Sequence, residues 1–214
     1  MSNSGHIVSA VISTYNAERF IGPCIEDLEN QTIADQTEII VVDSASPQNE
    51  GAIVRSYQQK YENIRYIRSA ERESVYGAWN RGIAIAQGKY ITNANTDDRH
   101  RQDAFERMAS VLDTRPNIAL VYADVYKTEI ESQVFDQCGP GGRFKWYDWD
   151  RTRLLKKGCF MGPQPMWRRD VHDVFGHFND GLISSGDFEF WLRISQLFEF
   201  QHLKIPLGLY LKRE

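Results

Sequence analysis

Residues 88–98 read Gly-Lys-Tyr-Ile-Thr-Asn-Ala-Asn-Thr-Asp-Asp. Before them, apolar residues recur at helical spacing over 75–86, and Gly88 is the kind of residue that ends a helix. The apolar stretch at 90–92 predicts a short buried strand, and the carboxylates Asp97 and Asp98 follow it after a brief polar tip. The segment therefore predicts an α/β fold with polar chemistry beyond the end of a strand.

The same alternation extends on both sides of this segment. Short apolar runs predict strands at 7–13, 38–42, 64–67, 90–92 and 118–125. Helical spacing predicts helices at 18–31, 51–61, 75–86 and 102–112, with Pro23 marking the start of the regular part of the first. Repeated strand–helix alternation is typical of a mostly parallel central sheet flanked by helices. Ligands bind such sheets beyond the carboxyl ends of the strands, where the polar clusters 13–16, 43–46 and 95–98 fall.

The second half has a different character. Residues 128–149 are polar, then rich in glycine, then aromatic, and we expect an irregular connection there. A short helix is predicted at 149–155, a longer one at 188–197 and a last strand at 203–211. We treat 1–214 as one domain, with a nucleotide-sugar-binding half at 6–125 and an acceptor-side half at 126–214. The chain could be a domain excised from a longer protein.

Composition excludes several classes of protein. The 214 residues carry 25 Lys and Arg against 29 Asp and Glu, a net charge of −4, so no basic excess indicates nucleic acid as a partner. The three cysteines form no Cys-x-x-Cys pair, which argues against structural zinc and disulfides and favours a reducing compartment. No apolar run is long enough to span a membrane. We expect a cytoplasmic location, with peripheral contact at the inner face of a membrane left open.

Four acidic side chains are candidates for chemistry. Adjacent carboxylates at Asp97 and Asp98 repel each other unless a cation lies nearby, and oxygen ligands suit Mg²⁺ or Mn²⁺. An acidic turn that starts the next helix is the alternative. Asp43, at a strand end, could accept a hydrogen bond from a base or ribose, or could simply form a turn. Asp187 could accept a proton from a hydroxyl, or only cap the helix that follows.

The order of these motifs is more specific than any one of them. The chain reads Val-Ile-Ser-Thr-Tyr-Asn at 11–16, Ile-Ile-Val-Val-Asp-Ser-Ala-Ser at 39–46 and Gly-Ala-Trp-Asn-Arg-Gly-Ile at 77–83. After the acidic pair it closes with Gly-Asp-Phe-Glu-Phe-Trp-Leu-Arg at 186–193. This series resembles the family 2 inverting glycosyltransferases, which have the Rossmann-like GT-A fold. The resemblance extends over nearly the whole chain and is weakest at 128–149.

The resemblance implies a role for each matching position. Ser13, Thr14 and Tyr15 would hold the nucleotide base, and Asp43 with Ser44 would bind the base or ribose. Asp97 and Asp98 would form the metal-binding motif for Mn²⁺ or Mg²⁺, with Asp98 on the metal and Asp97 on the sugar or ribose, or the reverse. Asp187 would be the catalytic base that deprotonates the acceptor hydroxyl. The donor is expected to be a UDP-sugar, and the acceptor a glycan or a lipid-linked sugar.

Two departures from the family pattern bear on activity. Asn95 stands where many relatives have an aspartate, and Gly186 stands before the base where an acid is common, which makes Glu189 a rival base. Asn95 favours the alternative that the chain is a catalytically degenerate nucleotide-sugar or glycan-binding domain, whereas Asp187 argues for an enzyme. A nucleotidyltransferase or a dinucleotide-dependent oxidoreductase would need a glycine-rich loop after the first strand, and 13–18 contains no glycine.

Overall fold

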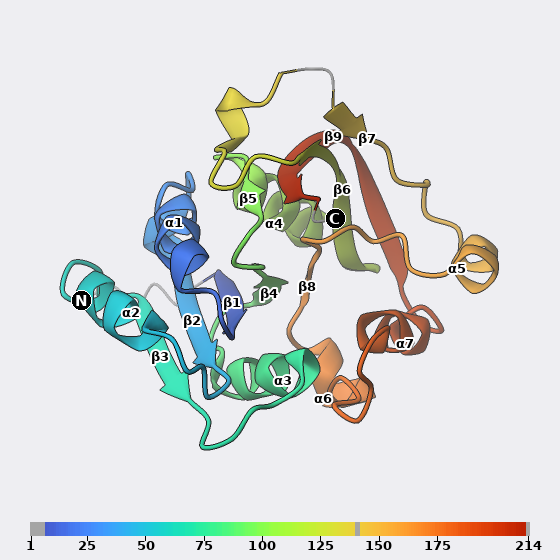
Figure 1. Ribbon diagram of the computed structural model, residues 1–214. Coiled ribbons are helices and arrows are strands. Elements are labelled where there is room, and N and C mark those ends of the chain that lie inside the picture. Colours follow the sequence, from blue (N-terminus) through green and yellow to red (C-terminus); the bar gives the residue numbers. More distant parts are fainter. Residues whose placement is uncertain (1–6, 140–141, 213–214) are drawn as a thin grey trace, which may run out of the picture.

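The computed structural model describes residues 7–139 and 142–212. In the first part, strands and helices alternate as predicted (Figure 1). The strands are β1 (Val8–Thr14), β2 (Thr37–Asp43), β3 (Ile64–Arg68) and β4 (Tyr90–Asn93). The helices are α1 (Glu18–Glu29), α2 (Glu50–Gln58) and α3 (Val75–Ile85), with a 3₁₀ turn, η1 (Ala34–Gln36), before β2.

The second part has shorter elements and longer connections. Its helices are α4 (Ala104–Thr114), α5 (Arg151–Lys157), α6 (Val171–Phe175) and α7 (Gly186–Ile194), with a 3₁₀ turn, η2 (Phe135–Gln137). Its strands are β5 (Arg99–His100), β6 (Ile118–Thr128), β7 (Arg143–Phe144), β8 (Met166–Arg168) and β9 (Glu199–Leu211). None of the helices that the structure describes is both long and apolar enough to cross a membrane.

One sheet runs through both parts, in the order β3-β2-β1-β4-β8-β6-β9-β5, with β7 beside β6. The strands β3, β2, β1 and β4 are parallel to one another. Beyond them, β8 is antiparallel to both β4 and β6, β9 is parallel to β6, and β5 is antiparallel to β9. The α/β fold is confirmed, but the sheet is mixed, and the parallel arrangement that we predicted dominates only its first half.

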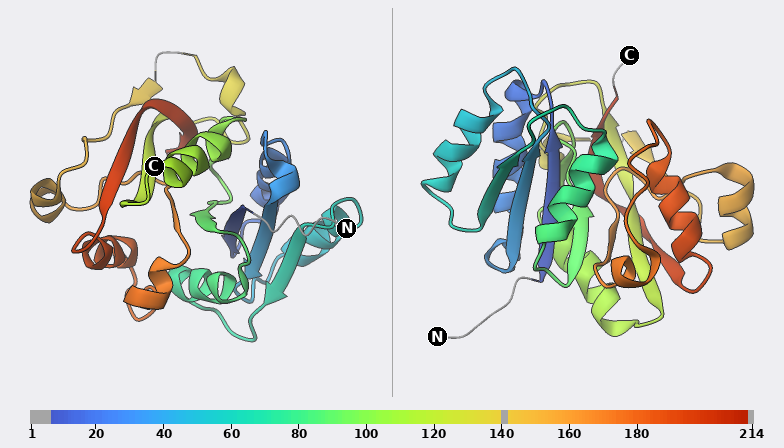
Figure 2. Two further views of the ribbon diagram at one scale, coloured as in Figure 1. Left: turned by 180° about the vertical axis from the view of Figure 1, so that it is seen from behind. Right: turned by 90° about the horizontal axis from the view of Figure 1, so that it is seen from below.

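Helices cover both faces of this sheet. On one face, apolar residues of α1, α2 and α4 pack against β1 and β2 in a core that includes Ile25, Val54 and Phe105. On the other face, α3, α6 and α7 pack in a second core that includes Trp79, Val171 and Phe190. Seen from behind and from below, the strands remain between these two groups of helices (Figure 2). Because both faces are covered, ligands must approach the edges of the sheet.

Several predicted boundaries were wrong. Helix α1 begins at Glu18 and runs through Pro23, so this proline lies inside the helix and does not start it. Proline removes one backbone donor from a helix, but the helix continues because Ile21, Ile25 and Leu28 are fully buried. The last strand begins at Glu199, four residues earlier than we expected. Strands β5, β7 and β8 and helix α6 were not predicted at all.

Candidate functional site

The end of β1 carries the first of the predicted binding residues. Ser13 is half-buried, and the buried Thr14 has a hydroxyl oxygen that makes no hydrogen bond within the described part of the chain. Tyr15 follows at the strand tip, where the guanidinium of Arg72 lies 4.1 Å from the centroid of its ring. A buried hydroxyl without a partner is costly. The tip of β1 therefore presents an unsatisfied polar atom beside an aromatic ring.

Asp43 ends β2 and is held from three sides. Its side chain is 0% exposed. One carboxylate oxygen accepts a hydrogen bond from the backbone N–H of Ser46 at 2.8 Å. The other accepts one from the hydroxyl of Tyr66 at 2.6 Å and pairs with the guanidinium of Arg68. An ionised carboxylate offers about four lone-pair sites, so these contacts fix Asp43 and leave room for one further donor.

The tips of β1 and β2 are joined through a buried carboxylate. Asn16 and Ala45 both adopt left-handed backbone conformations, with φ of 52° and 54°. The side chain of Glu50 accepts hydrogen bonds from the backbone N–H of Ala17 and from the hydroxyl of Ser46, both at 2.8 Å. Left-handed residues other than glycine cost about 1–3 kcal/mol each and gather at functional sites. The two tips are thus strained turns held in place by Glu50.

The acidic pair after β4 divides into one buried and one half-exposed side chain. Asp98 is 2% exposed, and its oxygens accept hydrogen bonds from the side-chain amide of Asn95 at 2.8 Å and from the backbone N–H of Leu211 at 3.1 Å. Burial, with the Asp97 charge a smaller contribution, raises the pKa of Asp98 to about 6. The pair is followed by β5, and α4 begins only at Ala104, so it does not start a helix.

Asp187 lies in the first turn of α7. Its two carboxylate oxygens are approached by the hydroxyl of Tyr76 at 3.3 Å and by the sulfur of Cys159 at 3.7 Å. The residue before the helix, Ser185, has φ of 62° and makes no capping hydrogen bond through its side chain. The rival base Glu189 forms an ion pair with Arg193 at 2.7 Å, one turn along the same helix.

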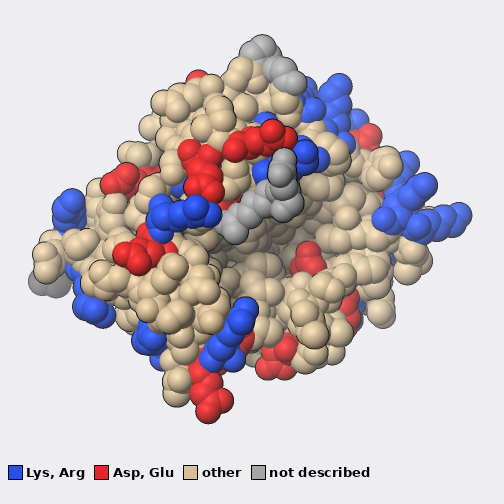
Figure 3. Space-filling view, in the orientation of Figure 1, with Lys and Arg blue, Asp and Glu red and all other residues tan. Residues whose placement is uncertain are grey.

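The structure brings these groups to one edge of the sheet. Strands β1, β2 and β4 are parallel, with Thr14 opposite Asp43, so their carboxyl ends lie together. Ser44 bonds to Glu73 in the loop before α3, since its hydroxyl accepts from the backbone N–H at 2.6 Å. Tyr76 then carries the contact from α3 to Asp187. This face of the molecule is hollowed near its centre, over the region of β4 and β8 (Figure 3).

A divalent cation at this edge of the sheet would need oxygen atoms of a bound phosphate, as well as protein side chains, to complete its coordination. The described residues contain no group of three or more His, Cys, Asp or Glu side chains placed to hold a metal. Mg²⁺ commonly takes one or two carboxylates and completes its coordination with phosphate oxygens and water. Asp97 is half-exposed and could supply a carboxylate oxygen of that kind, whereas Asp98 is only 2% exposed.

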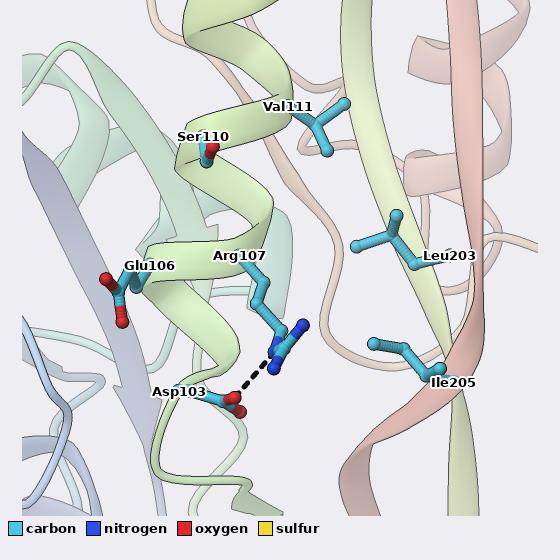
Figure 4. A pocket seen from close by; sticks show the side chains of 7 residues that line it. All are labelled: Asp103, Glu106, Arg107, Ser110, Val111, Leu203 and Ile205. Carbon is cyan, nitrogen blue, oxygen red and sulfur yellow. Dashed lines mark hydrogen bonds and ion pairs between the residues drawn. The ribbon is translucent and has the colours of Figure 1, made fainter.

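Aromatic rings of the segment 144–149 pack within the fold. The ring centroids of Trp149 and Phe200 are 4.3 Å apart, and those of Trp146 and Phe144 are 4.6 Å apart. These rings therefore stabilise the fold. Tyr147 is half exposed. An open pocket between α4 and β9, with the ion pair of Asp103 and Arg107 on its α4 side, includes none of the predicted site residues (Figure 4). Its lining residues are Asp103, Glu106, Arg107, Ser110, Val111, Leu203 and Ile205.

Sequence reasoning missed the residues that hold the predicted ones in place. Tyr66 and Arg68 lie on β3 and reach Asp43 only because β3 pairs with β2. Tyr76 and Cys159 contact Asp187 across 111 and 28 residues of sequence. No local pattern in the sequence marks such long-range partners. Tyr76 alone could have been suspected from the sequence, because it immediately precedes the motif at 77–83.

Comparison with relatives supports one family. Residues 9–176 match the model of glycosyl transferase family 2. The chain is 27% identical over 188 residues to an uncharacterized glycosyltransferase of Methanocaldococcus jannaschii, covering 87% of this chain and 64% of that protein. It is 23% identical over 197 residues to the chondroitin synthase of Escherichia coli, covering 92% of this chain and 28% of that protein. The chain thus spans less than two thirds of the length of these relatives.

Solved structures show the same fold at lower identity. The Staphylococcus aureus protein TarS (residues 1–349), in complex with UDP-GlcNAc, superposes with a TM-score of 0.77 at 18% identity, covering 97% of this chain and 59% of that one. The mannosyltransferase PcManGT from Pyrobaculum calidifontis, in complex with GDP-Man and Mn²⁺, gives 0.73 at 16% identity, covering 97% and 57%. With its family match over 9–176 and this shared architecture, the chain belongs to glycosyl transferase family 2 and has the GT-A fold.

Proposed function

We propose that this chain is an inverting glycosyltransferase that moves a sugar from a nucleoside-diphosphate sugar to an acceptor hydroxyl. The observation that carries the proposal is that Asp43 and Asp97 follow the carboxyl ends of the parallel strands β2 and β4, while Tyr76, in the first turn of α3, reaches Asp187. Family membership supports the class of reaction. The three carboxylates have different surroundings, which suggests a different role for each.

The donor nucleotide would bind at the tips of β1 and β2. Thr14 has a buried hydroxyl in need of a partner, and Asp43 keeps one acceptor position for a base or ribose donor. Ser13 and Ser44 lie beside them, and Tyr15 with Arg72 offers a flat surface for the base. We favour a UDP-sugar, because TarS has been solved with UDP-GlcNAc, while PcManGT, solved with GDP-Man, makes a guanosine donor the other outcome to test.

A divalent cation, Mn²⁺ or Mg²⁺, would bind through Asp97. We assign this role to Asp97 in preference to Asp98, because Asp97 is half-exposed, whereas Asp98 is only 2% exposed. When bound, such an ion would offset negative charge on the diphosphate of the donor. Asp98 would instead hold the loop in which Asp97 lies, close to the end of β9.

The chemical step would be a single displacement at the anomeric carbon. The acceptor oxygen forms the new bond as the bond from that carbon to the diphosphate oxygen breaks, so the configuration inverts. Asp187 would take the proton of the acceptor hydroxyl, because it lies at a helix start and its two carboxylate oxygens face the donors Tyr76 and Cys159. Glu189 is paired with Arg193 and is the weaker candidate for the base.

Acceptor recognition would fall to the second half of the chain. Strand β8 pairs with β4, and β7, which lies in the connection at 128–149, pairs with β6 on the other side of β8. A glycan or lipid-linked sugar is the proposed acceptor, in polysaccharide or glycoconjugate biosynthesis, a role suggested by the name of the chondroitin synthase relative. Exchange of 128–149 with the matching segment of a relative should change which acceptors are used, and unchanged acceptor choice would count against this assignment.

Donor binding is tested most simply by thermal unfolding with UDP, GDP and other nucleoside diphosphates, each with and without Mn²⁺. A ligand that binds only the folded state stabilises it by RT ln(1 + [L]/Kd), or about 2.7 kcal/mol at a hundredfold excess over Kd. We expect a Mn²⁺-dependent rise in the unfolding midpoint with one nucleotide, abolished in Asp97→Asn. The absence of any shift in a cooperatively unfolding protein would overturn the proposed donor site.

A further inference from the structure

Tyr76 is packed into the second core. It lies in the first turn of α3 and is 5% exposed. Its ring meets Trp79 edge-on at 5.5 Å and lies near-parallel to Phe178 at 6.1 Å. Aromatic packing of this kind fixes the orientation of a ring. The hydroxyl at the end of the ring is therefore held at one place.

The ring of Tyr76 lies directly against the start of α7. A Cβ atom placed on Gly186 would lie only 2.7–2.9 Å from three carbon atoms of this ring. Real side chains do not approach so closely, so the position of the Tyr76 ring requires glycine at 186. Since Gly186 immediately precedes Asp187, the ring sets the distance between α3 and the backbone that carries the carboxylate.

The Tyr76 hydroxyl reaches Asp187 as a hydrogen-bond donor. Its oxygen is 3.3 Å from one carboxylate oxygen of Asp187. Burial, followed by the Asp187 charge, raises the pKa of Tyr76, so the hydroxyl stays protonated. The sulfur of Cys159 lies 3.7 Å from the other oxygen, and a thiol with an ordinary pKa of about 8.5 is protonated at neutral pH. Both carboxylate oxygens therefore face donors.

We infer that Tyr76 is a positioning residue for Asp187, and this inference rests on the proposed role of Asp187 as the base. The hydroxyl of Tyr76 favours the ionised carboxylate and fixes its rotamer, which leaves the remaining lone pairs directed at an acceptor hydroxyl. The thiol of Cys159 is the weaker second donor. Tyr76 itself touches neither the donor nor the acceptor in this account.

Tyr76→Phe keeps the ring and removes only the hydroxyl. We expect kcat for UDP release from UDP-sugars to fall about tenfold, while KM for the donor stays within about twofold. The acid limb of the pH–kcat profile should move to higher pH, by about half a pH unit or more, because the ionised carboxylate has lost a donor. A merely structural role would not move this limb.

Tyr90→Phe is the matched control. Tyr90 is also buried and donates its hydroxyl to an aspartate, Asp113, at 2.7 Å, but it lies at the opposite end of the sheet at the start of β4. We expect this variant to keep the wild-type kcat and pH profile. Wild-type kcat and an unmoved acid limb in Tyr76→Phe would overturn the inference.

A second measurement needs no substrate. Unfolding midpoints of Tyr76→Phe, Asp187→Ala and the double variant should be non-additive, because the two residues share one contact. Additive midpoints would overturn the inference whatever the activity. Asp187→Asn with wild-type turnover would instead overturn the proposed function, and the stability cycle would still decide whether Tyr76 holds this carboxylate. The two failures are therefore distinguishable.

Discussion

The side-chain amide of Asn95 donates a hydrogen bond to the buried carboxylate of Asp98 at 2.8 Å. Asn95 is one of the two positions at which the chain departs from the acidic pattern that we expected for its family. Because Asp98 is buried and next to Asp97, a third carboxylate at 95 would add a like charge where the structure uses a donor. The asparagine thus has a structural role. Its presence can be explained without assuming that the protein has lost its activity.

Asn95→Asp should therefore destabilise the protein. The substitution replaces a donor to Asp98 with an acceptor, and leaving a buried charged acceptor unpaired costs about 1–3 kcal/mol. Urea unfolding at neutral pH would measure the loss. An unchanged or increased free energy of unfolding would contradict the role that we give to Asn95.

Asp97→Asn and Asp98→Asn form a matched pair with opposite expected results. Asp97→Asn should lose Mn²⁺-dependent binding of a nucleoside diphosphate while the free energy of unfolding changes by less than about 1 kcal/mol. Asp98→Asn should lose about 1–3 kcal/mol of stability, because its amide group would face one of the two donors that now bind it. Calorimetric titration and urea unfolding separate the two effects. Exchanged outcomes would return the metal to Asp98.

His172 should make stability depend on pH. It is 8% exposed, accepts a hydrogen bond from the indole N–H of Trp167 at 3.0 Å and contacts the carbonyl of Gly176 at 2.9 Å. Burial lowers the pKa of His172 from 6.5 to about 4. In the unfolded chain this histidine is protonated below about pH 6.5, whereas in the folded protein it is protonated only below about pH 4. The free energy of unfolding therefore decreases as the pH falls from about 6.5 to about 4.

The loss from this one group is at most about 3 kcal/mol. Because carboxylates contribute to the same pH range, the quantity to measure is the difference between wild type and His172→Gln in urea unfolding from pH 7 to pH 4. We expect the variant to show a smaller fall. Equal falls in the two proteins would show that His172 does not titrate as its burial requires. Since His172 packs on Phe190 of α7, this group also supports the helix that carries Asp187.

Gly186→Ala tests the close approach of α3 and α7. The new methyl group would meet the Tyr76 ring, and overpacking of this kind costs about 1–3 kcal/mol. Gly77→Ala, in α3 beside Tyr76, is the control, because its Cβ would have ordinary contacts of 3.5 Å or more and alanine favours a helix. We expect thermal midpoints to fall in the first variant and to stay or rise in the second. A neutral Gly186→Ala would contradict the packing described here.

The sequence predicted the elements whose periodicity is local. Strands β1, β2 and β4 contain short runs of mostly apolar residues, and α4 carries Phe105, Met108 and Leu112 on one face, so each could be recognised without its neighbours. Strand β8 could not, because its three residues follow Pro163 and Pro165 and become a strand only by pairing with β4 and β6. The antiparallel pairs that make the sheet mixed all involve β8, β5 or β7, none of which was predicted.

The site was predictable to a similar degree. Polar residues after β1, β2 and β4 could be assigned to one edge because parallel strands end together. The environment of each acid could not be foreseen: Asp97 and Asp98 are neighbours in sequence, but only the end of β9, 113 residues away, makes Asp98 the buried one. The partners of Asp187 likewise come from α3 and from the segment after α5.

The central claim is that Asp187 is the base of a nucleotide-sugar-dependent transfer. The most direct measurement is UDP release from a panel of UDP-sugars with Mn²⁺, comparing wild type with Asp187→Asn, with donor affinity measured in parallel. Positioned base catalysis contributes about 10²–10⁴-fold, so we expect kcat to fall by that factor in Asp187→Asn while the donor binds as before. Wild-type kcat in Asp187→Asn would contradict the account.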